Sequence, residues 1–355
     1  MVGVALLGAG IFAREEHLPA IEASSDLELK AVWSRSESSA QALAAAVKSG
    51  AGSVDIYHGY SPSAAAAGKS LDDLLKREDV EGVIIALPIL SQPDVVEKAL
   101  RAGKHVLSEK PIAGDVQKGQ ELVSMYRGLA DGRPIWAVAE NFRYTASLVY
   151  AAQKVKELRE VGGELTTFRL QQNGFVKRDN KYWNTEWRKV PEYQGGFLLD
   201  GGVHFVAGLR LLLTSLSPSN EISSLAAFST LLEERLLPVD TVHAVAKTQS
   251  GKIGTISLSF GTEFKSGLEI DVNTTKGSVF WEPKSVRVVT SAGEETRKFE
   301  KDSGVKAEVA AFGKSIVEGK ADPRQTPEEG LKDLEVLQRL LESGEAGASV
   351  KTMHV

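Results

Sequence analysis

Short apolar runs alternate with helical patterns over the first 140 residues, and this alternation limits the possible folds more than any other feature. We predict strands at Val4–Leu7, Leu27–Trp33, Val54–Tyr57, Gly82–Leu87, His105–Leu107 and Ile135–Val138. We predict helices between them at Ile11–Ala23, Ser36–Val47, Ser70–Lys76, Pro93–Ala102 and Asp115–Leu129. Continuous apolar runs are typical of strands buried on both faces, so the pattern indicates βαβ units and a parallel sheet.

The pattern changes after Phe142 to longer and often alternating segments. The strands predicted there are Leu165–Asn173, Ser223–Leu231, Thr241–Thr248, Ile253–Phe260, Leu268–Asn273, Ser278–Trp281 and Val286–Thr290. The helices are Ser147–Arg159, Phe197–Leu213, Val305–Val317 and Glu328–Leu341. Turn signals between the strands favour an antiparallel sheet. A chain of 355 residues also exceeds the size of one hydrophobic core. We therefore expect an α/β domain over residues 1–140 and an α+β domain over residues 141–355.

Charge and cysteine content narrow the class of partner. The formal net charge is -5 and no long run of Lys and Arg is present, which argues against nucleic acid. The chain has no cysteine, so disulfides and thiolate chemistry are excluded, and a reducing compartment fits. The apolar run Val2–Leu7 is too short for a secretory signal, and no stretch approaches the roughly 20 apolar residues of a membrane span. We expect a cytoplasmic protein that binds a small molecule, with neither nucleic acid nor membrane as partner.

A glycine-rich loop, Gly8-Ala9-Gly10-Ile11-Phe12-Ala13, follows the first predicted strand and precedes a helix. This context is the one that a dinucleotide fingerprint requires. The first glycine allows a tight turn, the second lets the backbone approach a pyrophosphate, and the small third residue lets the helix pack on the strand. We predict that Gly8, Gly10, Ile11 and Phe12 bind a cofactor. The alternative is a glycine-rich turn without a ligand.

The end of the second strand favours NADP over NAD. NAD-specific sites usually carry Asp or Glu there, about 20 residues after the loop, to bind the ribose 2′-hydroxyl. Here the strand ends in Ser34-Arg35, and a guanidinium pairs well with a 2′-phosphate. Ser34 and Arg35 are therefore predicted to bind NADP. The alternative is that Arg35 is a solvated charge at a helix start and that Glu37 serves the ribose.

The fourth and fifth strands end at further candidate residues. Leu87 and Pro88 follow the fourth strand, and Glu109-Lys110-Pro111 follows the fifth. Open α/β sheets bind ligands at the carboxyl ends of their strands, so Leu87, Pro88, Glu109 and Lys110 are predicted cofactor residues. A positive nicotinamide and partial burial would disfavour the charged form of Lys110, which suits acid–base work. From the spacing alone, Glu109 and Lys110 could equally form an exposed ion pair.

The segment from Gly195 to His204 holds another candidate pair, Asp200 and His204, spaced by four residues. On a helix they would share one face, and histidine titrates close to neutrality. The glycines Gly201 and Gly202 between them make a regular helix doubtful. A histidine beside apolar residues is often a structural core residue. No metal site is predicted, because further ligands with recognisable spacing are lacking.

Other polar and aromatic side chains are weaker candidates. Asn141 follows the sixth strand and is predicted to border the cofactor, while Arg143 either contacts substrate or ties the domains together. Trp183 and Trp187 either stack on a sugar ring or form a packed loop. The histidines other than His204 have no spacing partner and are interpreted as structural or surface residues, with His17 able to approach the cofactor loop.

With Gly8-Ala9-Gly10, Glu109-Lys110-Pro111 and the Gly195–His204 segment in that order, the sequence resembles the glucose–fructose oxidoreductase/inositol dehydrogenase/rhizopine catabolism (Gfo/Idh/MocA) family. The run from Trp183 to Arg210 is most similar to fungal members. The resemblance implies a Rossmann domain followed by a domain with a large, mostly antiparallel, open-faced sheet, through which a homodimer or homotetramer forms. It implies that Lys110 contacts substrate and nicotinamide and that His204 moves the proton. Asp200 would bind substrate or support the histidine.

One departure concerns the residue three positions after the histidine, where many members carry Asp and this chain has Ala207. The resemblance favours an NADP-dependent oxidoreductase that moves a hydride between the nicotinamide and a secondary alcohol or ketone of a sugar, polyol, cyclitol or related carbonyl compound. Two alternatives stay open. One is a non-catalytic NADP-binding regulator of the same fold. The other is a dihydrodiol dehydrogenase-like enzyme, which Trp183 and Trp187 favour.

Overall fold

The computed structural model describes residues 1–48, 54–61, 63, 65–130 and 132–354, and these form two compact units. The first unit consists of residues 1–140 and 305–330, and the second of residues 141–304 and 331–355. The chain therefore returns to the first unit after completing most of the second. This return differs from the sequence-based division, which cut the chain once, after residue 140. The two units carry the predicted architectures, a Rossmann sheet and a large, mostly antiparallel sheet.

The sheet of the first unit is parallel throughout its described pairings. Its strands are β1 (Val2–Leu7), β2 (Leu27–Ser34), β3 (Asp55–His58), β4 (Gly82–Ile85), β5 (His105–Glu109) and β6 (Trp136–Ala139). Their order is β3-β2-β1-β4-β5-β6, which is the doubly wound dinucleotide-binding order. β1 and β4 are buried along their whole length, which explains why both were recognisable as continuous apolar runs.

The helices of the first unit are α1 (Leu18–Glu22), α2 (Glu37–Ala44), α3 (Leu71–Leu75), α4 (Gln92–Arg101), α5 (Val116–Arg127) and α9 (Val305–Glu318). Side chains cap the N-termini of α2, α3 and α5. Ser36 and Asp115 accept from backbone N–H groups at the starts of α2 and α5, and Ser70 and Asp73 form a capping box. A π-helical turn, Ala13–His17, precedes α1. The buried side chains of α9, such as Phe312, complete the core beside Leu18 and Ile21.

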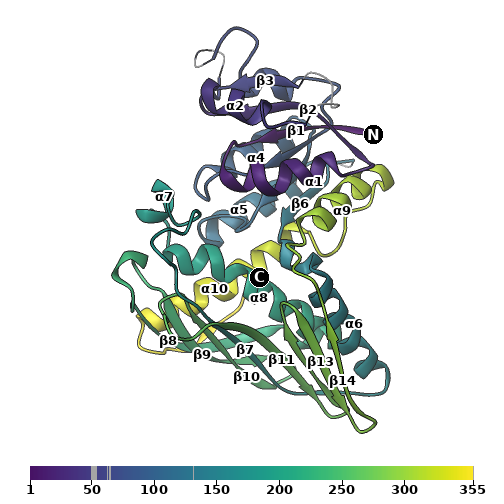
Figure 1. Cartoon of the computed structure of the whole chain (residues 1–355), viewed down its shortest axis with the longest axis vertical. Coiled ribbons are helices and arrows are strands. Elements are labelled where there is room, and N and C mark those ends of the chain that lie inside the picture. The colour runs from purple at the N-terminus through teal and green to yellow at the C-terminus, as the bar shows by residue number, and fades with distance from the viewer. Residues whose placement is uncertain (49–53, 62, 64, 131, 355) are drawn as a thin grey trace. The chain divides into compact units, whose positions relative to one another are not determined.

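The second unit is built on a long mixed sheet (Figure 1). Its strands are β7 (Leu165–Asn173), β8 (Ile222–Thr230), β9 (Thr241–Thr248), β10 (Ile253–Ser259), β11 (Gly267–Thr274), β12 (Gly277–Glu282), β13 (Ser285–Thr290), β14 (Gly293–Lys298) and β15 (Lys351–Thr352). Their order is β14-β13-β12-β11-β7-β10-β9-β8-β15. The pair β7/β10 is parallel, and the other described pairings are antiparallel.

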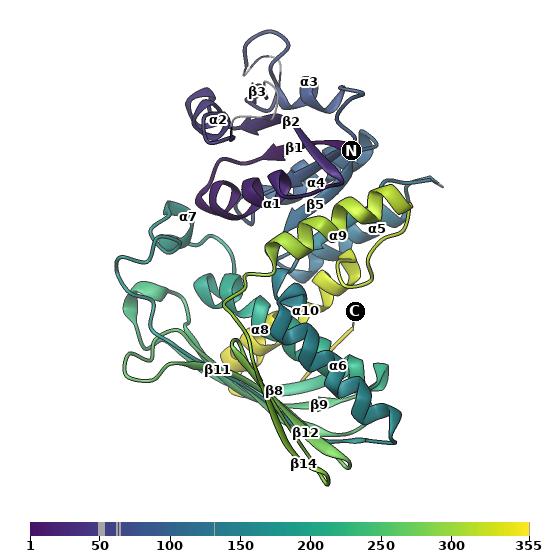
Figure 2. The same cartoon turned by 45° about the vertical axis from the view of Figure 1, so that its right-hand side comes forward.

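Helices lie against one face of this sheet (Figures 1 and 2). The helices of the second unit are α6 (Ala146–Glu160), α7 (Glu186–Lys189) and α8 (Gly196–Leu216), together with most of α10 (Pro327–Glu345). α6 contacts β12 and β13, and α8 contacts β7, β10 and β11. Buried and exposed residues alternate along the strands. In β9 the exposed residues His243, Val245 and Lys247 lie on the face opposite the helices. The sheet therefore keeps one open face within its own unit.

α8 is the central helix of the second unit. It is 21 residues long and, within the described part of the chain, is long and apolar enough to cross a membrane by length and composition. The sequence expectation that no such stretch exists therefore has to be corrected. However, 72% of its most apolar window is buried inside the protein, which is typical of a core helix. The predicted helix continues through Gly201 and Gly202, where a regular helix was doubtful from the sequence. A Cβ on Gly201 would lie 2.8 Å from the Phe260 ring, so glycine here allows close packing within the helix.

Candidate functional site

The glycine loop has the form needed to approach a pyrophosphate. Gly8 has φ +115°, and a Cβ on it would lie 2.2 Å from the Ala86 carbonyl oxygen, so other residues are excluded. A Cβ on Gly10 would meet no described atom within 4 Å, which leaves open space against this backbone. Ile11 and Phe12 begin the helical segment, whose first N–H groups favour an anion. The residues present therefore fit a dinucleotide.

The carboxyl end of β2 is followed by the guanidinium of Arg35. Arg35 is exposed and makes no hydrogen bond or ion pair with any residue that the structure describes. Glu37, the alternative ribose ligand, accepts a hydrogen bond from Gln41 and lies 3.9 Å from His58. Tyr60, which was not singled out from the sequence, lies close enough to Arg35 for the arginine charge to affect its pKa. Burial raises the pKa of Tyr60, and the charge of Arg35 opposes that rise.

The carboxyl end of β5 presents Glu109 and Lys110 beside a cis peptide bond to Pro111. Gln92, which was not singled out from the sequence, donates from Nε2 to the carbonyl oxygens of Glu109 and Pro111 and so holds the backbone on both sides of Lys110. The Glu109 carboxylate accepts from the Lys110 N–H at 3.1 Å. Side chains therefore hold the backbone on both sides of Lys110.

The carboxyl ends of β1, β2, β4 and β5 meet at one edge of the parallel sheet. The predicted cofactor residues at this edge are Gly8, Gly10, Ile11, Phe12, Ser34, Arg35, Leu87, Pro88, Glu109 and Lys110. Ser34 is nearly buried, whereas Leu87 and Pro88 are partly exposed directly after β4. The first unit therefore gathers these predicted residues where open α/β sheets bind ligands. Their roles in binding stay predictions.

In the second unit, Asp200 and His204 lie one turn apart on α8 and share a helix face. Asp200 is 5% exposed, and Arg188 donates from Nε to its Oδ2 at 2.7 Å. His204 is half-buried and stacks on the Phe142 ring, with the ring centroids 4.8 Å apart. Burial and the negative charge of Asp200 raise the pKa of Tyr193, against the opposing charge of Arg188. Arg188 and Tyr193 thus belong to the surroundings of Asp200.

The two tryptophans of the preceding segment pack against cations. The Arg188 guanidinium lies 3.9 Å from the Trp187 ring centroid, and the Arg235 guanidinium lies 4.8 Å from that of Trp183. The Trp183 Nε1 is buried and has no hydrogen-bond partner among the described residues. These contacts are those of a packed loop. A sugar-stacking role for either tryptophan stays a prediction.

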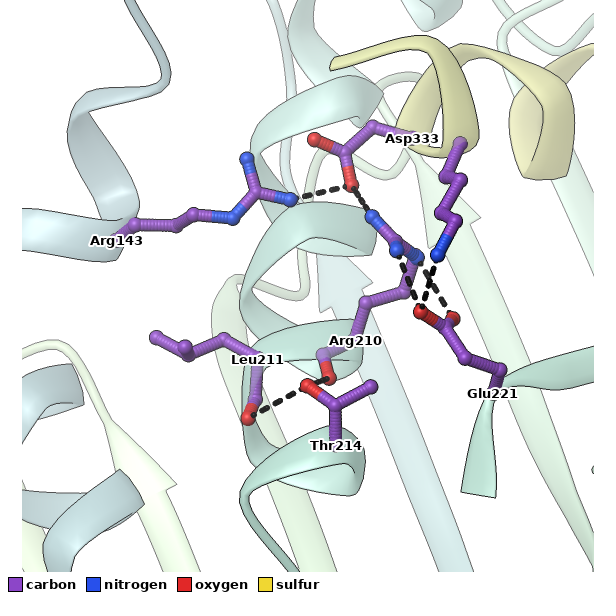
Figure 3. Close-up of polar contacts among 7 residues, drawn as sticks. Arg143, Arg210, Leu211, Thr214, Glu221 and Asp333 are labelled. Carbon is purple, nitrogen blue, oxygen red and sulfur yellow. Dashed lines mark hydrogen bonds and ion pairs between the residues drawn. The ribbon is translucent and has the colours of Figure 1, made fainter. Parts of the chain in front are cut away.

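Arg143 belongs to a buried charge network inside the second unit (Figure 3). Its Nη2 donates to Asp333 Oδ1 at 2.7 Å, and Arg210 Nη1 donates to the same oxygen. Arg210 also holds both oxygens of Glu221, to which Lys332 adds a contact at 3.3 Å. Arg143, Arg210 and Asp333 are at most 3% exposed. A substrate role for Arg143 stays a prediction, and the contacts seen are structural.

Asn141, the last predicted cofactor residue, lies in the second unit, and its Nδ2 donates to the Ser303 carbonyl. The described residues contain no group of three or more His, Cys, Asp or Glu that could hold a metal. Gln92 was missed from the sequence, because its contacts with Glu109 and Pro111 join distant positions that no local spacing reveals. Arg188 lies in the polar-aromatic segment of Trp183 and Trp187, but its contact with Asp200 was not predicted.

Comparison with known proteins covers most of the chain. The family model "Oxidoreductase family, NAD-binding Rossmann fold" matches residues 2–130, and "Oxidoreductase family, C-terminal alpha/beta domain" matches residues 156–352. Dehydrogenase FPY6 of Fusarium mangiferae is 51% identical over 356 residues, which cover 99% of each chain. Similarity to this fungal protein extends over both units.

Solved structures agree with this assignment. An oxidoreductase from Thermotoga maritima is similar with a TM-score of 0.82 and 30% identity, over 99% of this chain and 98% of that one. KijD10 is a 3-ketoreductase from Actinomadura kijaniata, crystallised with NADP and TDP-benzene. Its TM-score is 0.74 at 20% identity, and the match covers 96% of this chain and 97% of that one. At that identity KijD10 shares the fold alone. With both family models matched along its length, the chain belongs to the Gfo/Idh/MocA family of oxidoreductases.

Proposed function

We propose that this protein is an NADP-dependent oxidoreductase that transfers a hydride between the nicotinamide and a secondary alcohol or ketone of a sugar, polyol, cyclitol or related carbonyl compound. The observation that carries the cofactor choice is the exposed Arg35 at the end of β2, which has no hydrogen bond or ion pair within the described chain. A guanidinium in this position could form charge-assisted hydrogen bonds with a 2′-phosphate. Glu37, in contrast, is engaged by Gln41.

The chemistry follows from the residue types. Gly8 and Gly10 would let the backbone take the pyrophosphate, and Arg35 would take the 2′-phosphate. A bound nicotinamide supplies or accepts the hydride. His204 would take the proton of the substrate hydroxyl during oxidation and return it during reduction, and Lys110 would contact substrate and nicotinamide. Groups in such roles contribute about 10²- to 10⁴-fold in rate.

Asp200 has a supporting role in this proposal. Its carboxylate is held by Arg188 and lies on the same face of α8 as His204. Carboxylate oxygens accept hydrogen bonds, so Asp200 would act as an acceptor for a substrate hydroxyl or for the histidine. The name of the FPY6 relative, a dehydrogenase, supports oxidoreduction.

Titration of the purified protein with NADPH and NADH, followed by cofactor fluorescence, tests the cofactor. We expect NADPH to bind more tightly, and Arg35→Ala to weaken NADPH by about 10- to 100-fold, as expected for a charged hydrogen bond, with little effect on NADH. Glu37→Ala is the matched control and should leave NADPH binding unchanged. Equal loss of both cofactors in Arg35→Ala contradicts the NADP assignment.

Substrate chemistry needs a separate assay. Sugars, inositols and small diketones are screened for NADPH oxidation or NADP reduction, first with the wild type and then with His204→Asn. The proposal expects turnover of at least one compound and its loss in the variant. A protein that binds NADPH yet turns over none of these classes contradicts this substrate proposal and favours a regulator.

We also propose that the open face of the second sheet pairs with a second copy of the chain, giving a homodimer or homotetramer in the cytoplasm. Phe228, Val245 and Ile253 are 69%, 55% and 56% exposed. By strand register they lie on the same face, because Phe228 pairs with His243 and Ile253 with Lys247. Exposed apolar side chains clustered on one sheet face are typical of an interface.

A further inference from the structure

His17 is a fully buried histidine on the turn that follows the glycine loop. Its side chain is 0% exposed, and its Nε2 lies 2.7 Å from Glu109 Oε1. The turn Ala13–His17 is π-helical, since the Leu18 N–H bonds to the Ala13 carbonyl. Such turns contain one residue more than an α-helical turn and occur often at functional sites. Here the wider turn brings His17 to the end of β5.

Glu109 joins His17 to the backbone of Lys110. One carboxylate oxygen contacts His17 Nε2, and the other accepts from the Lys110 N–H at 3.1 Å. The Glu109 side chain is 12% exposed, so its oxygens have little access to water. The contact with His17 therefore replaces water that the carboxylate would otherwise bind. It also links the turn after the glycine loop with the turn that carries Lys110.

The second ring nitrogen of His17 indicates where its proton resides. Nδ1 is buried and has no hydrogen-bond partner among the described residues. A proton on Nδ1 would be a buried donor without an acceptor, which is costly, whereas a proton on Nε2 has Glu109 as acceptor. The His17 ring also packs against Phe12 in an edge-to-face arrangement, with the centroids 5.3 Å apart. This geometry favours a neutral imidazole protonated on Nε2.

We propose that His17 is a positioning residue that holds the Glu109 carboxylate through a neutral N–H, and so fixes the Lys110 turn relative to the pyrophosphate loop. A neutral N–H donor holds the Glu109 carboxylate in place without neutralising it. The negative charge of Glu109 can then interact with the nicotinamide end of the cofactor and with the Lys110 ammonium. This inference rests on the proposed function of the glycine loop and Lys110.

Three substitutions separate the hydrogen bond from the packing. His17→Gln places an amide N–H near the position of Nε2, whereas His17→Asn has the same chemistry but a shorter reach. His17→Phe keeps the ring and its contact with Phe12 but has no donor. We expect the Gln variant to stay within about 3-fold of wild type in NADPH dissociation constant and kcat. The Asn and Phe variants should lose about 10- to 100-fold in kcat on the substrate found by the screen, the range for a hydrogen bond to a charged group.

Nitrogen-15 NMR of the histidine-labelled protein gives a readout independent of turnover. The proposal expects the His17 ring to show the neutral form with Nε2 protonated, and expects Glu109→Gln to change that signal. A His17 signal protonated on both nitrogens or on Nδ1 alone overturns the proposal. So does an Asn variant as active as the Gln variant. A wild type that fails to bind NADPH instead overturns the proposed function, and leaves the NMR result as the test of the His17–Glu109 contact.

Discussion

Replacing Asp333 by Asn should strongly destabilise the second unit. A single oxygen of this carboxylate accepts from both Arg143 and Arg210, and Asp333 and Arg210 are each 1% exposed (Figure 3). Removing one partner from a buried ion pair costs about 3–5 kcal/mol, because the buried charges that remain lose part of their compensation. For a unit of this size each kcal/mol lowers Tm by about 2–4 °C, so we expect a decrease of about 6–20 °C.

Urea and thermal unfolding followed by circular dichroism measure this effect. Glu269→Gln is the matched control, because it also removes an acidic partner of an arginine in the same sheet unit. Glu269 and Arg169 are each 42% exposed, so this variant should lose no more than about 1 kcal/mol. Equal destabilisation by the two substitutions would refute the argument from burial.

A double-mutant cycle examines the network itself. Arg143→Met and Asp333→Asn should each destabilise the protein, and together they should cost less than the sum, because either change alone already removes the contact between Arg143 and Asp333. Strict additivity within about 0.5 kcal/mol would show that Arg143 and Asp333 do not interact as the structure indicates.

Three further predictions concern catalysis, acid stability and assembly. Lys110→Met should lower turnover by about 10²- to 10⁴-fold in the NADPH assay, and wild-type rates would contradict its assigned role. Burial acts to raise the pKa of Glu221, but Arg210 and Lys332 outweigh it, so the folded pKa lies below the ordinary value. The stability that Glu221 contributes is complete above its unfolded pKa of about 4.5 and is lost as the pH falls through the lower folded value. Glu221→Gln should therefore flatten the decline of unfolding free energy below that pH. Val245→Asp should reduce the mass measured by light scattering, whereas Val317→Asp, an exposed control outside the sheet, should not.

Most of the fold could be predicted because its strands carry a clear burial pattern. β9 was predicted with the bounds that the structure has. From Val242 to Thr248 its residues alternate strictly between buried and exposed. β14 was missed because Gly293–Lys298 is exposed throughout and contains no apolar residue to signal a strand. It pairs only with β13 among the described strands, so its ladder hydrogen bonds and not its side chains define it.

The candidate site could be predicted only where a local motif exposes it. The glycine loop and Glu109-Lys110-Pro111 are each a continuous stretch of sequence. The structure places them after β1 and β5, at the same edge of the parallel sheet. The contacts that hold them are not contiguous: His17 meets Glu109 across 92 positions in the chain. Pairings of this kind depend on how the helices pack on the sheet, which one sequence does not reveal.

The return of the chain to its first unit affects the order in which the protein can fold during synthesis. Phe312 and its neighbours on α9 belong to the core of the first sheet, yet they leave the ribosome only after residues 141–304. Domains generally fold as units when their residues become available. A nascent Rossmann unit ending at residue 140 would therefore expose Leu18 and Ile21, and would remain incomplete until most of the second unit had been translated.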